Sequence, residues 1–164
     1  MSISLVRVDD RMIHGQIVLM WTKFYQGDAI VVLADEKVTK DKFMVNILKK
    51  SGNAMNKKVF VFGVEEAIEK LPKVIESNKR YFLISKQIHL LAEVRRAGID
   101  FGDTIIFGTA SQKSDTVKVY NNIYLSAEDV NDCKYLDSQG VTLNFKLIPD
   151  EEGTTWNNVK KIFN

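Results

Sequence analysis

The stretch "RVDDRMIHGQIV", residues 7–18, links a short apolar segment to a segment with helical periodicity. The first segment, "ISLVRV", is rich in branched apolar residues, which favour a β-strand. After the stretch, apolar positions recur at helical spacing through Ile17, Trp21 and Phe24, and "AIVVLA" is again typical of a strand. The sequence therefore predicts a strand, a helix and a second strand, with two acids, an arginine and a histidine at the first corner.

Strands and helices continue to alternate in the middle of the chain. Strands are predicted for "KVFVFG", "RYFLIS" and "TIIF", and helices for residues 39–51, "VEEAIEKL" and "IHLLAEVRRAG". Thr39 is the expected cap of the helix at 39–51 and Gly52 its expected end. Pro72 and Gly98 are expected just past the ends of the next two helices. The apolar face of the helix at 39–51 is predicted to carry Phe43, Ile47 and Leu48.

The last third of the chain has a different rhythm. "GTASQKSD" is a loop by composition, and "VKVY" and "IYL" flank an Asn-Asn turn. "SAED" has the spacing of a capping box for a helix that runs to about residue 138 and ends at Gly140. "VTLNFKLI" alternates apolar and polar residues, and we expect it to form an antiparallel strand at the edge of the sheet. "TTWNNVKKIF" predicts a short terminal helix that docks Trp156, Val159 and Phe163.

This alternation predicts an α/β fold in one domain spanning residues 1–164. The expected architecture is a mostly parallel central sheet of about seven strands, with helices on both faces and one antiparallel edge strand. Ligands in folds of this class bind at the carboxyl ends of the strands, where the strand-to-helix loops gather. The corner at residues 9–14 is the first such loop, so it is expected at the functional edge.

Composition excludes several classes of function. The chain has 23 basic and 21 acidic residues, so no strong field of one sign favours nucleic acid as a partner. One cysteine, Cys133, permits neither an internal disulfide nor a zinc ribbon and fits a reducing compartment. The apolar runs are far shorter than a membrane span of about 18 residues, and no signal-peptide pattern opens the sequence. We therefore expect a cytosolic protein.

Motifs for cofactors and metals are absent from the sequence. No Gly-x-Gly-x-x-Gly follows a strand, no phosphate-binding P-loop is present, and neither His-x-x-x-His nor Cys-x-x-Cys occurs. The sequence thus predicts no nucleotide cofactor and no metal. His89 precedes Glu93 by one helical turn, and a surface pair is the expected role for it.

The first corner brings together groups that suit phosphate chemistry. Free amides at the start of a helix favour an anion, and the forked guanidinium of Arg11 matches phosphate oxygens. An aspartate can orient the imidazole of His14, and Gly15 lets a partner's backbone approach closely. Composition and spacing leave two interpretations open: His14 is the reactive group, or it only flanks the helix while the neighbouring charges are solvated.

A resemblance to a known family bears on this choice. The segment "RVDDRMIHGQ" resembles the active loop of the enzyme IIB components of the mannose, fructose and sorbose family of the bacterial sugar phosphotransferase system. Only Met12 departs from that motif, in which leucine is usual. The likeness continues through Trp21, "VVLADEKVTKD" and "IYLSAEDVNDCKYLDSQGVTLNFKLIP", so it covers essentially the whole chain.

The resemblance implies a phosphoryl carrier without a cofactor. His14 would accept a phosphoryl group, on Nδ1 in this family, from a phosphohistidine of the IIA component. It would then pass the group to a sugar held by the membrane components IIC and IID, beside which the protein would work in the cytoplasm. Arg11 would steady the phosphate, and Asp9 would orient the ring or the incoming group. Asp10, Gly15 and Asp35 are expected to border the same cleft and to contact phosphate or a partner.

The loop after the fifth strand departs from the family pattern. Relatives often carry Asn-Val-Gly-Gly there, with glycine amides facing the site, whereas this chain has "IFGT". Gly108 and Thr109 are thus candidates for phosphate or partner binding. Thr109 could donate its hydroxyl to the phosphate, or the loop could be shaped for a particular partner.

The same loop also suits two alternatives to a carrier enzyme. One is a non-catalytic regulatory module that binds a partner through the same loop, against which the intact His14 and Arg11 argue. The other is a receiver-like domain, which the paired acids after the first strand suggest. A receiver also needs an aspartate after its third strand and a lysine after its fifth, where this chain has "VFGVEE" and "IIFGTASQ".

Overall fold

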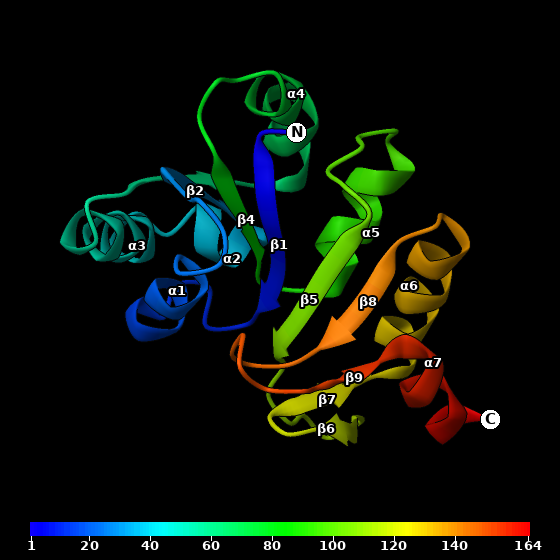
Figure 1. Ribbon diagram of the computed structural model, residues 1–164. Coiled ribbons are helices and arrows are strands. Elements are labelled where there is room, and N and C mark those ends of the chain that lie inside the picture. The colour runs from blue at the N-terminus through cyan, green and yellow to red at the C-terminus, as the bar shows by residue number, and fades with distance from the viewer.

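Seven strands form one central sheet in the computed structural model, which describes residues 1–164 (Figure 1). The strands are β1 (Ile3–Asp9), β2 (Ala29–Leu33), β3 (Lys58–Phe62), β4 (Tyr81–Ser85), β5 (Thr104–Thr109), β8 (Thr142–Phe145) and β9 (Thr154–Thr155). Their order across the sheet is β3-β2-β4-β1-β5-β8-β9. All neighbours are parallel except β8 and β9, which pair antiparallel. The predicted fold class is confirmed.

Helices cover both faces of this sheet. One face carries α1 (Gly15–Trp21), α2 (Glu36–Thr39) and α3 (Lys42–Ala54). The other carries α4 (Val64–Ile75), α5 (Ile88–Arg96), α6 (Ala127–Ser138), α7 (Trp156–Val159) and the 3-10 helix η1 (Lys160–Phe163). None of these helices has both the length and the apolar character needed to span a bilayer.

Strand β2 shows why the sheet needs two helical layers. All five of its residues are buried, and side chains of a strand alternate between faces. Ile30 and Val32 pack with α1 to α3, whereas Val31 and Leu33 pack with the helices of the opposite face. Such continuous apolar runs are typical of parallel strands buried on both sides.

A small antiparallel ribbon, β6 (Val117–Tyr120) and β7 (Ile123–Leu125), lies beyond the end of β5. Asn122 takes a left-handed conformation in its turn, as the Asn-Asn pair predicts. The ribbon is tied back to the chain after β5, because the Tyr124 amide donates to the Ala110 carbonyl over 2.9 Å. The capping box at Ser126 and the left-handed Gly140 after α6 are also confirmed.

Several predicted details are wrong. Helix α3 is capped by Asp41 rather than Thr39, because Thr39 ends the separate short helix α2. Gly52 lies inside α3, where a β-carbon would be only 2.2 Å from Val59 Cγ2, so it allows close packing on β3. Pro72 lies inside α4, and apolar packing of the final turn on the core offsets the lost hydrogen bond. Phe24, Phe43 and Ile47 are exposed rather than part of the core.

Two strands also differ from the prediction. Strand β8 is parallel to β5, because α6 returns the chain to the opposite end of the sheet before β8 begins, and the antiparallel strand is the short β9. Strand β5 extends through Gly108 and Thr109, which were expected in a loop, because Thr109 pairs with Asp9 of β1. The terminal helix is shorter than predicted, but Trp156 and Val159 are buried and Phe163 packs against the core.

The carboxyl ends of β2, β4, β1 and β5 meet at one edge of the sheet, because these strands are parallel. Four loops start there, at residues 10–14, 34–35, 86–87 and 110–116. All of the sequence-predicted site residues lie at this edge or at its strand ends.

Candidate functional site

The loop after β1 has one defined path. The amide of Met12 donates to the Asp9 carbonyl over 2.8 Å and closes a tight turn. Met12 has a φ of +62°, a conformation that costs a residue with a side chain about 1–2 kcal/mol. Its side chain is buried with those of α1, and this packing holds the turn. The turn delivers His14 to the start of α1.

His14 is the N-cap residue of α1. Its backbone is extended, and its carbonyl accepts the first helical hydrogen bond from the Val18 amide at 3.0 Å. The side chain does not cap the helix, and its buried Nδ1 has no hydrogen-bond partner in the chain. No carboxylate therefore orients this imidazole, in contrast to the expectation for Asp9.

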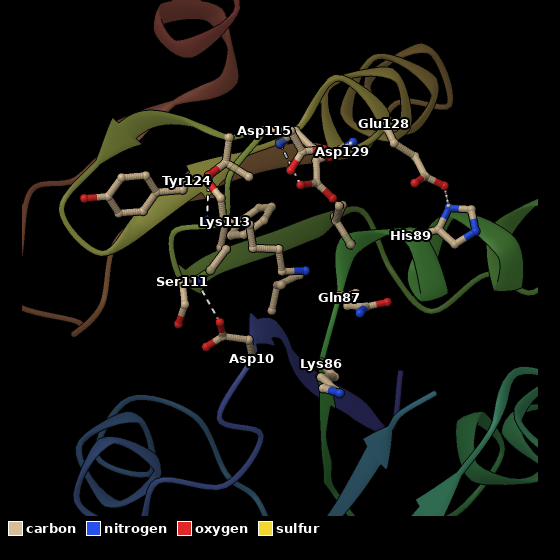
Figure 2. Close-up of a pocket in the computed structure, with 16 residues that line it drawn as sticks. Asp10, Lys86, Gln87, His89, Ser111, Lys113, Asp115, Tyr124, Glu128 and Asp129 are labelled. Atoms are coloured by element: carbon tan, nitrogen blue, oxygen red, sulfur yellow. Dashed lines mark hydrogen bonds and ion pairs between the residues drawn. The ribbon is translucent and has the colours of Figure 1, made fainter. Parts of the chain in front are cut away.

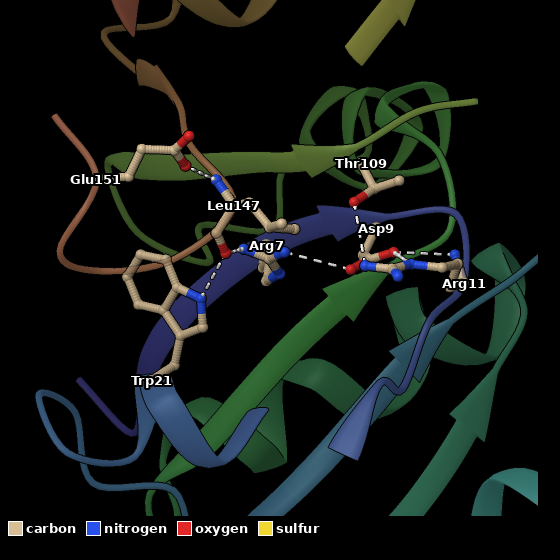
Figure 3. A network of polar contacts seen from close by, with 7 residues as sticks. All are labelled: Arg7, Asp9, Arg11, Trp21, Thr109, Leu147 and Glu151. Carbon is tan, nitrogen blue, oxygen red and sulfur yellow. Dashed lines mark hydrogen bonds and ion pairs between the residues drawn. The ribbon is translucent and has the colours of Figure 1, made fainter. Parts of the chain in front are cut away.

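The Asp9 side chain contacts two arginines instead (Figure 3). It is only 1 % exposed, and it accepts hydrogen bonds from Arg7 Nη2 at 3.2 Å and from the Arg11 amide at 3.0 Å. Arg11 Nε also lies 3.4 Å from Oδ1 of the same carboxylate. Asp9 thus links a buried cation to the cation of the loop.

Arg7 is the buried end of this chain of charges. Its Nη1 donates to the Leu147 carbonyl at 3.0 Å, to which Trp21 Nε1 also donates at 3.2 Å (Figure 3). Burial lowers the pKa of the Arg7 guanidinium, and the charge of Asp9 opposes this effect. Removing one partner of a buried ion pair of this kind leaves an uncompensated charge and strongly lowers the stability of the fold. Arg7 is not among the residues predicted from the sequence, although a charge within an apolar strand was an available signal.

Gly108 lies directly against Arg7. A β-carbon at Gly108 would be 2.1 Å from Arg7 Nη2. The position therefore has no space for a side chain while Arg7 holds its place. This steric role differs from the expected one, in which the glycine amide faces the site.

Arg11 and Thr109 meet on the outer side of this network. Arg11 Nη2 donates to Thr109 Oγ1 at 3.4 Å, and the Asp10 amide donates to the Thr109 carbonyl at 3.1 Å. The Arg11 side chain remains 43 % exposed, whereas Thr109 is buried. Asp9 and Thr109 thus fix one side of the Arg11 guanidinium and leave the rest accessible.

Asp10 points to a different place from Asp9. Its Oδ2 accepts from the Ser111 amide at 2.6 Å, and its buried Oδ1 has no partner. Figure 2 shows Asp10 at the edge of a cavity of about 220 Å³, opposite the first turns of α5 and α6. Lys86, Lys113 and His89 also line this cavity, but Arg11 and His14 do not. The two aspartates of the motif therefore serve two separate environments.

Asp35 reaches this cavity only through Lys86. It caps α2 by accepting from the Val38 amide at 3.2 Å, and its Oδ2 lies 2.9 Å from Lys86 Nζ. Burial raises the pKa of Asp35, but the bond and charge of Lys86 outweigh it and leave the pKa lowered. Lys86, which directly follows β4, was not identified from the sequence because nothing local distinguishes it from other lysines.

Gly15 is the first residue of α1. A β-carbon here would meet only Met55 Sδ, at the ordinary contact distance of 3.9 Å. The folded chain thus has no steric need for glycine at this position, unlike at Gly108.

His89 does more than pair with Glu93. Its Nδ1 lies 2.9 Å from Asp132 Oδ2 and 3.5 Å from Glu128 Oε1, and its Nε2 lies 3.6 Å from Glu93 Oε1. Burial alone lowers the pKa of His89, but the bond to Asp132 and the surrounding carboxylates raise it overall. His89 therefore joins α5 to α6, away from the loop of His14.

The chain was compared with known proteins. A family model described as the sorbose subfamily IIB component of the PTS system matches residues 3–163. The chain is 28% identical over 148 residues to the sorbose-specific EIIB component of Lacticaseibacillus casei, which covers 90% of this chain and 88% of that protein. It is 27% identical over 157 residues to the mannose-specific EIIAB component of Escherichia coli K12, which covers 90% of this chain and 45% of that protein.

Solved structures give the same result. The crystal structure of the IIBSor domain of the sorbose permease from Klebsiella pneumoniae superposes with a TM-score of 0.86 at 23% identity, covering 99% of this chain and 97% of that one. The structure of manxB from Thermoanaerobacter tengcongensis gives a TM-score of 0.84 at 28% identity, covering 97% and 95%. The chain belongs to the sorbose subfamily of the IIB components of the phosphotransferase system, the phosphotransferases of sugar uptake.

Proposed function

We propose that this protein carries a phosphoryl group on His14 between two other components of the phosphotransferase system. The donor is a phosphohistidine of a IIA component, and the acceptor is a sugar bound by the membrane components IIC and IID. One observation carries the proposal: the partner-free Nδ1 of His14 shares a five-residue loop with Arg11, whose guanidinium is held by Asp9 and Thr109. The EIIAB relative, with its longer chain, supports a IIA component as the donor.

Each transfer replaces one bond to phosphorus by another. In the first, the bond from phosphorus to the donor nitrogen breaks as a bond to a ring nitrogen of His14 forms. In the second, that bond breaks as a sugar oxygen attacks phosphorus, and the imidazole nitrogen freed from phosphorus takes up the proton of the sugar hydroxyl. Positioning and charge stabilisation supply most of the catalysis in such reactions. The fixed positive charge of Arg11 serves both steps, because it lies on the loop that holds the phosphoryl group.

Transfer to Nδ1 requires a movement of the ring. This atom is buried, so the imidazole turns about its side-chain bonds before the phosphorus can approach in line. The buried Nδ1 lacks a partner, so turning breaks no hydrogen bond of that atom within the chain.

The other candidate residues take supporting roles in this proposal. Asp9 is a positioning residue that acts through Arg11 instead of contacting the imidazole. The Thr109 hydroxyl accepts from Arg11, and Gly108 makes room for Arg7. Gly15 allows the backbone of a partner to come close. Asp10 and, through Lys86, Asp35 border the neighbouring cavity, where they contact a partner or the incoming group.

We also propose where the protein works and as what unit. Residues 1–164 act as one domain, in the cytoplasm, held at the membrane by the transporter components. Neither a nucleic acid nor a cofactor takes part.

Phosphate labelling with a sugar chase tests the proposal. The protein is incubated with phosphoenolpyruvate, the general phosphotransferase proteins and a cognate IIA component, and then with membranes that contain IIC, IID and sugar. The proposal predicts an acid-labile, base-stable label that moves to the sugar and is absent in His14→Ala. Arg11→Ala should slow both steps. A protein that is never labelled would be a regulatory module, and a base-labile label would indicate an aspartyl phosphate.

A further inference from the structure

Helices α1 and α3 lie on the same side of the central sheet (Figure 1). Both pack into the same apolar cluster against Ile30, Val32 and Phe82 of the sheet. The start of α1 also comes near the end of α3, because a β-carbon at Gly15 would lie 3.9 Å from Met55 Sδ. The sides of the two helices that point away from the sheet therefore lie on one side of the molecule, which we call the α1–α3 face.

Large apolar side chains are concentrated on this face. Of nine exposed large apolar residues in the chain, six lie between residues 19 and 47. Phe43 is 74 % exposed and Phe24 58 %, values far from those of core residues. Phe43 and Ile47 are one helical turn apart, so they share one stripe of α3. The full set is Leu19 and Met20 of α1, Phe24 and Tyr25 just after this helix, and Phe43 and Ile47 of α3. Tyr25 also borders a groove over β1 and β5.

Basic residues surround these apolar side chains. Residues 15–63 contain eight lysines, no arginine and four acids, for a net charge of +4, whereas the whole chain has only +2. Within residues 42–63 there are five lysines and no acid. The α3 lysines Lys42, Lys49 and Lys50 are exposed, and Lys49 lines a groove at the β3 edge together with Glu66 of α4. The rest of the molecule is therefore slightly acidic, and the excess positive charge belongs to the same segment of the chain as the exposed aromatic rings.

We propose that the α1–α3 face binds the surface of an anionic phospholipid bilayer. Exposed aromatic and aliphatic side chains on a helix surface enter the boundary between head groups and acyl chains, while flanking lysines contact lipid phosphates. Residues 36–63 offer this combination, with seven lysines and only two acids, Glu36 and Asp41. A partner that offered acidic groups alone would match the lysines and leave the two exposed phenylalanines in water.

The α1–α3 face lies next to the loop that carries His14. Helix α1 begins immediately after His14, so the α1–α3 face adjoins the proposed phosphate carrier. Lipid binding would keep His14 near the plane of the membrane, where an acceptor held by membrane components is found. Only this consequence rests on the proposed function, because the lipid contact itself needs no phosphoryl transfer.

Co-sedimentation with vesicles tests the proposal. The whole protein is mixed with vesicles of phosphatidylcholine alone or of phosphatidylcholine with phosphatidylglycerol, at low and high salt. Two double variants disrupt the face, Phe43→Ser with Ile47→Ser and Lys42→Glu with Lys50→Glu. A matched control, Val117→Ser with Ile162→Ser, removes exposed apolar side chains elsewhere. All these side chains are exposed, and urea unfolding checks that the variants keep their stability.

We expect binding to the phosphatidylglycerol vesicles that weakens at high salt. Each variant of the face should lower the partition coefficient by about tenfold or more, and the control should bind like the unmodified protein. Absence of binding, or equal binding by all variants, would overturn the proposal. Self-association that Phe43→Ser with Ile47→Ser abolishes, without vesicle binding, would assign the face to a second copy and also overturn it. Labelling of His14 is measured separately, so the two proposals can fail independently.

Discussion

The backbone of Gly108 lies so close to the Arg7 guanidinium that a β-carbon at Gly108 would be 2.1 Å from Arg7 Nη2. This approach lets Arg7 stay buried between β1 and β5 while it holds Asp9, and Asp9 in turn holds Arg11. A residue without a side chain on one strand thus sets the position of a cation in the neighbouring loop.

Gly108→Ala should destabilise the fold, because the methyl group forces Arg7 out of place. We expect a loss of about 1–3 kcal/mol in the free energy of unfolding, as for other overpacked sites. Urea denaturation measures this loss. Gly15→Ala is the matched control, because its methyl group meets only Met55 at a normal distance, and its stability should change by no more than about 0.5 kcal/mol. Equal effects of both variants would contradict the steric role of Gly108.

Gly15→Ala also separates folding from partner binding. The folded chain accommodates the methyl group, so any loss of activity must come from the approach of another protein. We predict slower phosphorylation by the IIA component with unchanged stability. Stopped-flow or quench-flow measurement of the transfer rate checks this. A rate equal to that of the unmodified protein would mean that no partner backbone comes close to Gly15.

Asp9 should act through Arg11. Asp9→Ala leaves the buried Arg7 with neither a counter-ion nor a hydrogen-bond acceptor, which costs about 3–5 kcal/mol for buried pairs. Asp9→Asn also removes the charge but keeps an acceptor oxygen for Arg7, so it is the variant for kinetics. Asp9→Asn and Arg11→Ala should each slow transfer to His14, and the double variant should be no slower than Arg11→Ala alone. Multiplicative effects in this double-mutant cycle would show that Asp9 has a role independent of Arg11.

The Thr109 hydroxyl should matter only as an acceptor for Arg11. Thr109→Val keeps the shape and removes the hydroxyl, whereas Thr109→Ser keeps the hydroxyl. One hydrogen bond to a partly exposed charge is worth about 1 kcal/mol, so Thr109→Val should slow transfer by about fivefold. Thr109→Ser should transfer nearly normally. If Thr109→Ser is as slow as Thr109→Val, keeping the hydroxyl does not preserve transfer, which would contradict a role as an acceptor alone.

His89 should make stability depend on pH. Its pKa is raised in the folded protein by Asp132 and Glu128 of α6 and by Glu93 of its own helix, with Arg96 on the far side of Asp132. A raised pKa means that folding binds a proton, so the stabilisation is complete below the unfolded pKa of about 6.5. It is lost as pH rises through the folded value. The stability difference between the unmodified protein and His89→Gln should therefore be larger at pH 5.5–6 than at pH 9, as urea denaturation measures. A difference that grows with pH would contradict the ion pairs.

The sequence predicted those parts of the fold that depend on local chemistry. Apolar periodicity located most strands and helices, and the Ser126 capping box and Gly140 marked both ends of α6. Local signals did not distinguish two possible helix caps that lie close in sequence, Thr39 and Asp41, of which Asp41 caps α3. The direction of β8 depends on how α6 returns the chain, and alternation of side chains is the same for parallel and antiparallel strands.

For the candidate site, too, the sequence predicted the positions of residues along the chain but not their contacts. The motif predicted Asp9, Arg11 and His14 at one strand-to-helix corner, and the structure places Asp9 at the end of β1 and His14 at the start of α1. Their contacts could not be predicted, because the partner of Asp9 is Arg7 within the strand and the partner of Arg11 is Thr109, 98 residues away in the chain. The buried position of Arg7 and the cavity at Asp10 exist only once β1, β4 and β5 are aligned.

The central claim is that His14 carries the phosphoryl group, and nuclear magnetic resonance of the phosphorylated protein tests it most directly. The chain has only two histidines, so labelling the imidazoles with ¹⁵N gives signals from His14 and His89 alone. After incubation with phosphoenolpyruvate, the general phosphotransferase proteins and the IIA component, a ring nitrogen of His14 should show coupling to ³¹P, and His89 should show none. Coupling at His89, or a phosphorylated protein with no coupling at His14, would contradict the account.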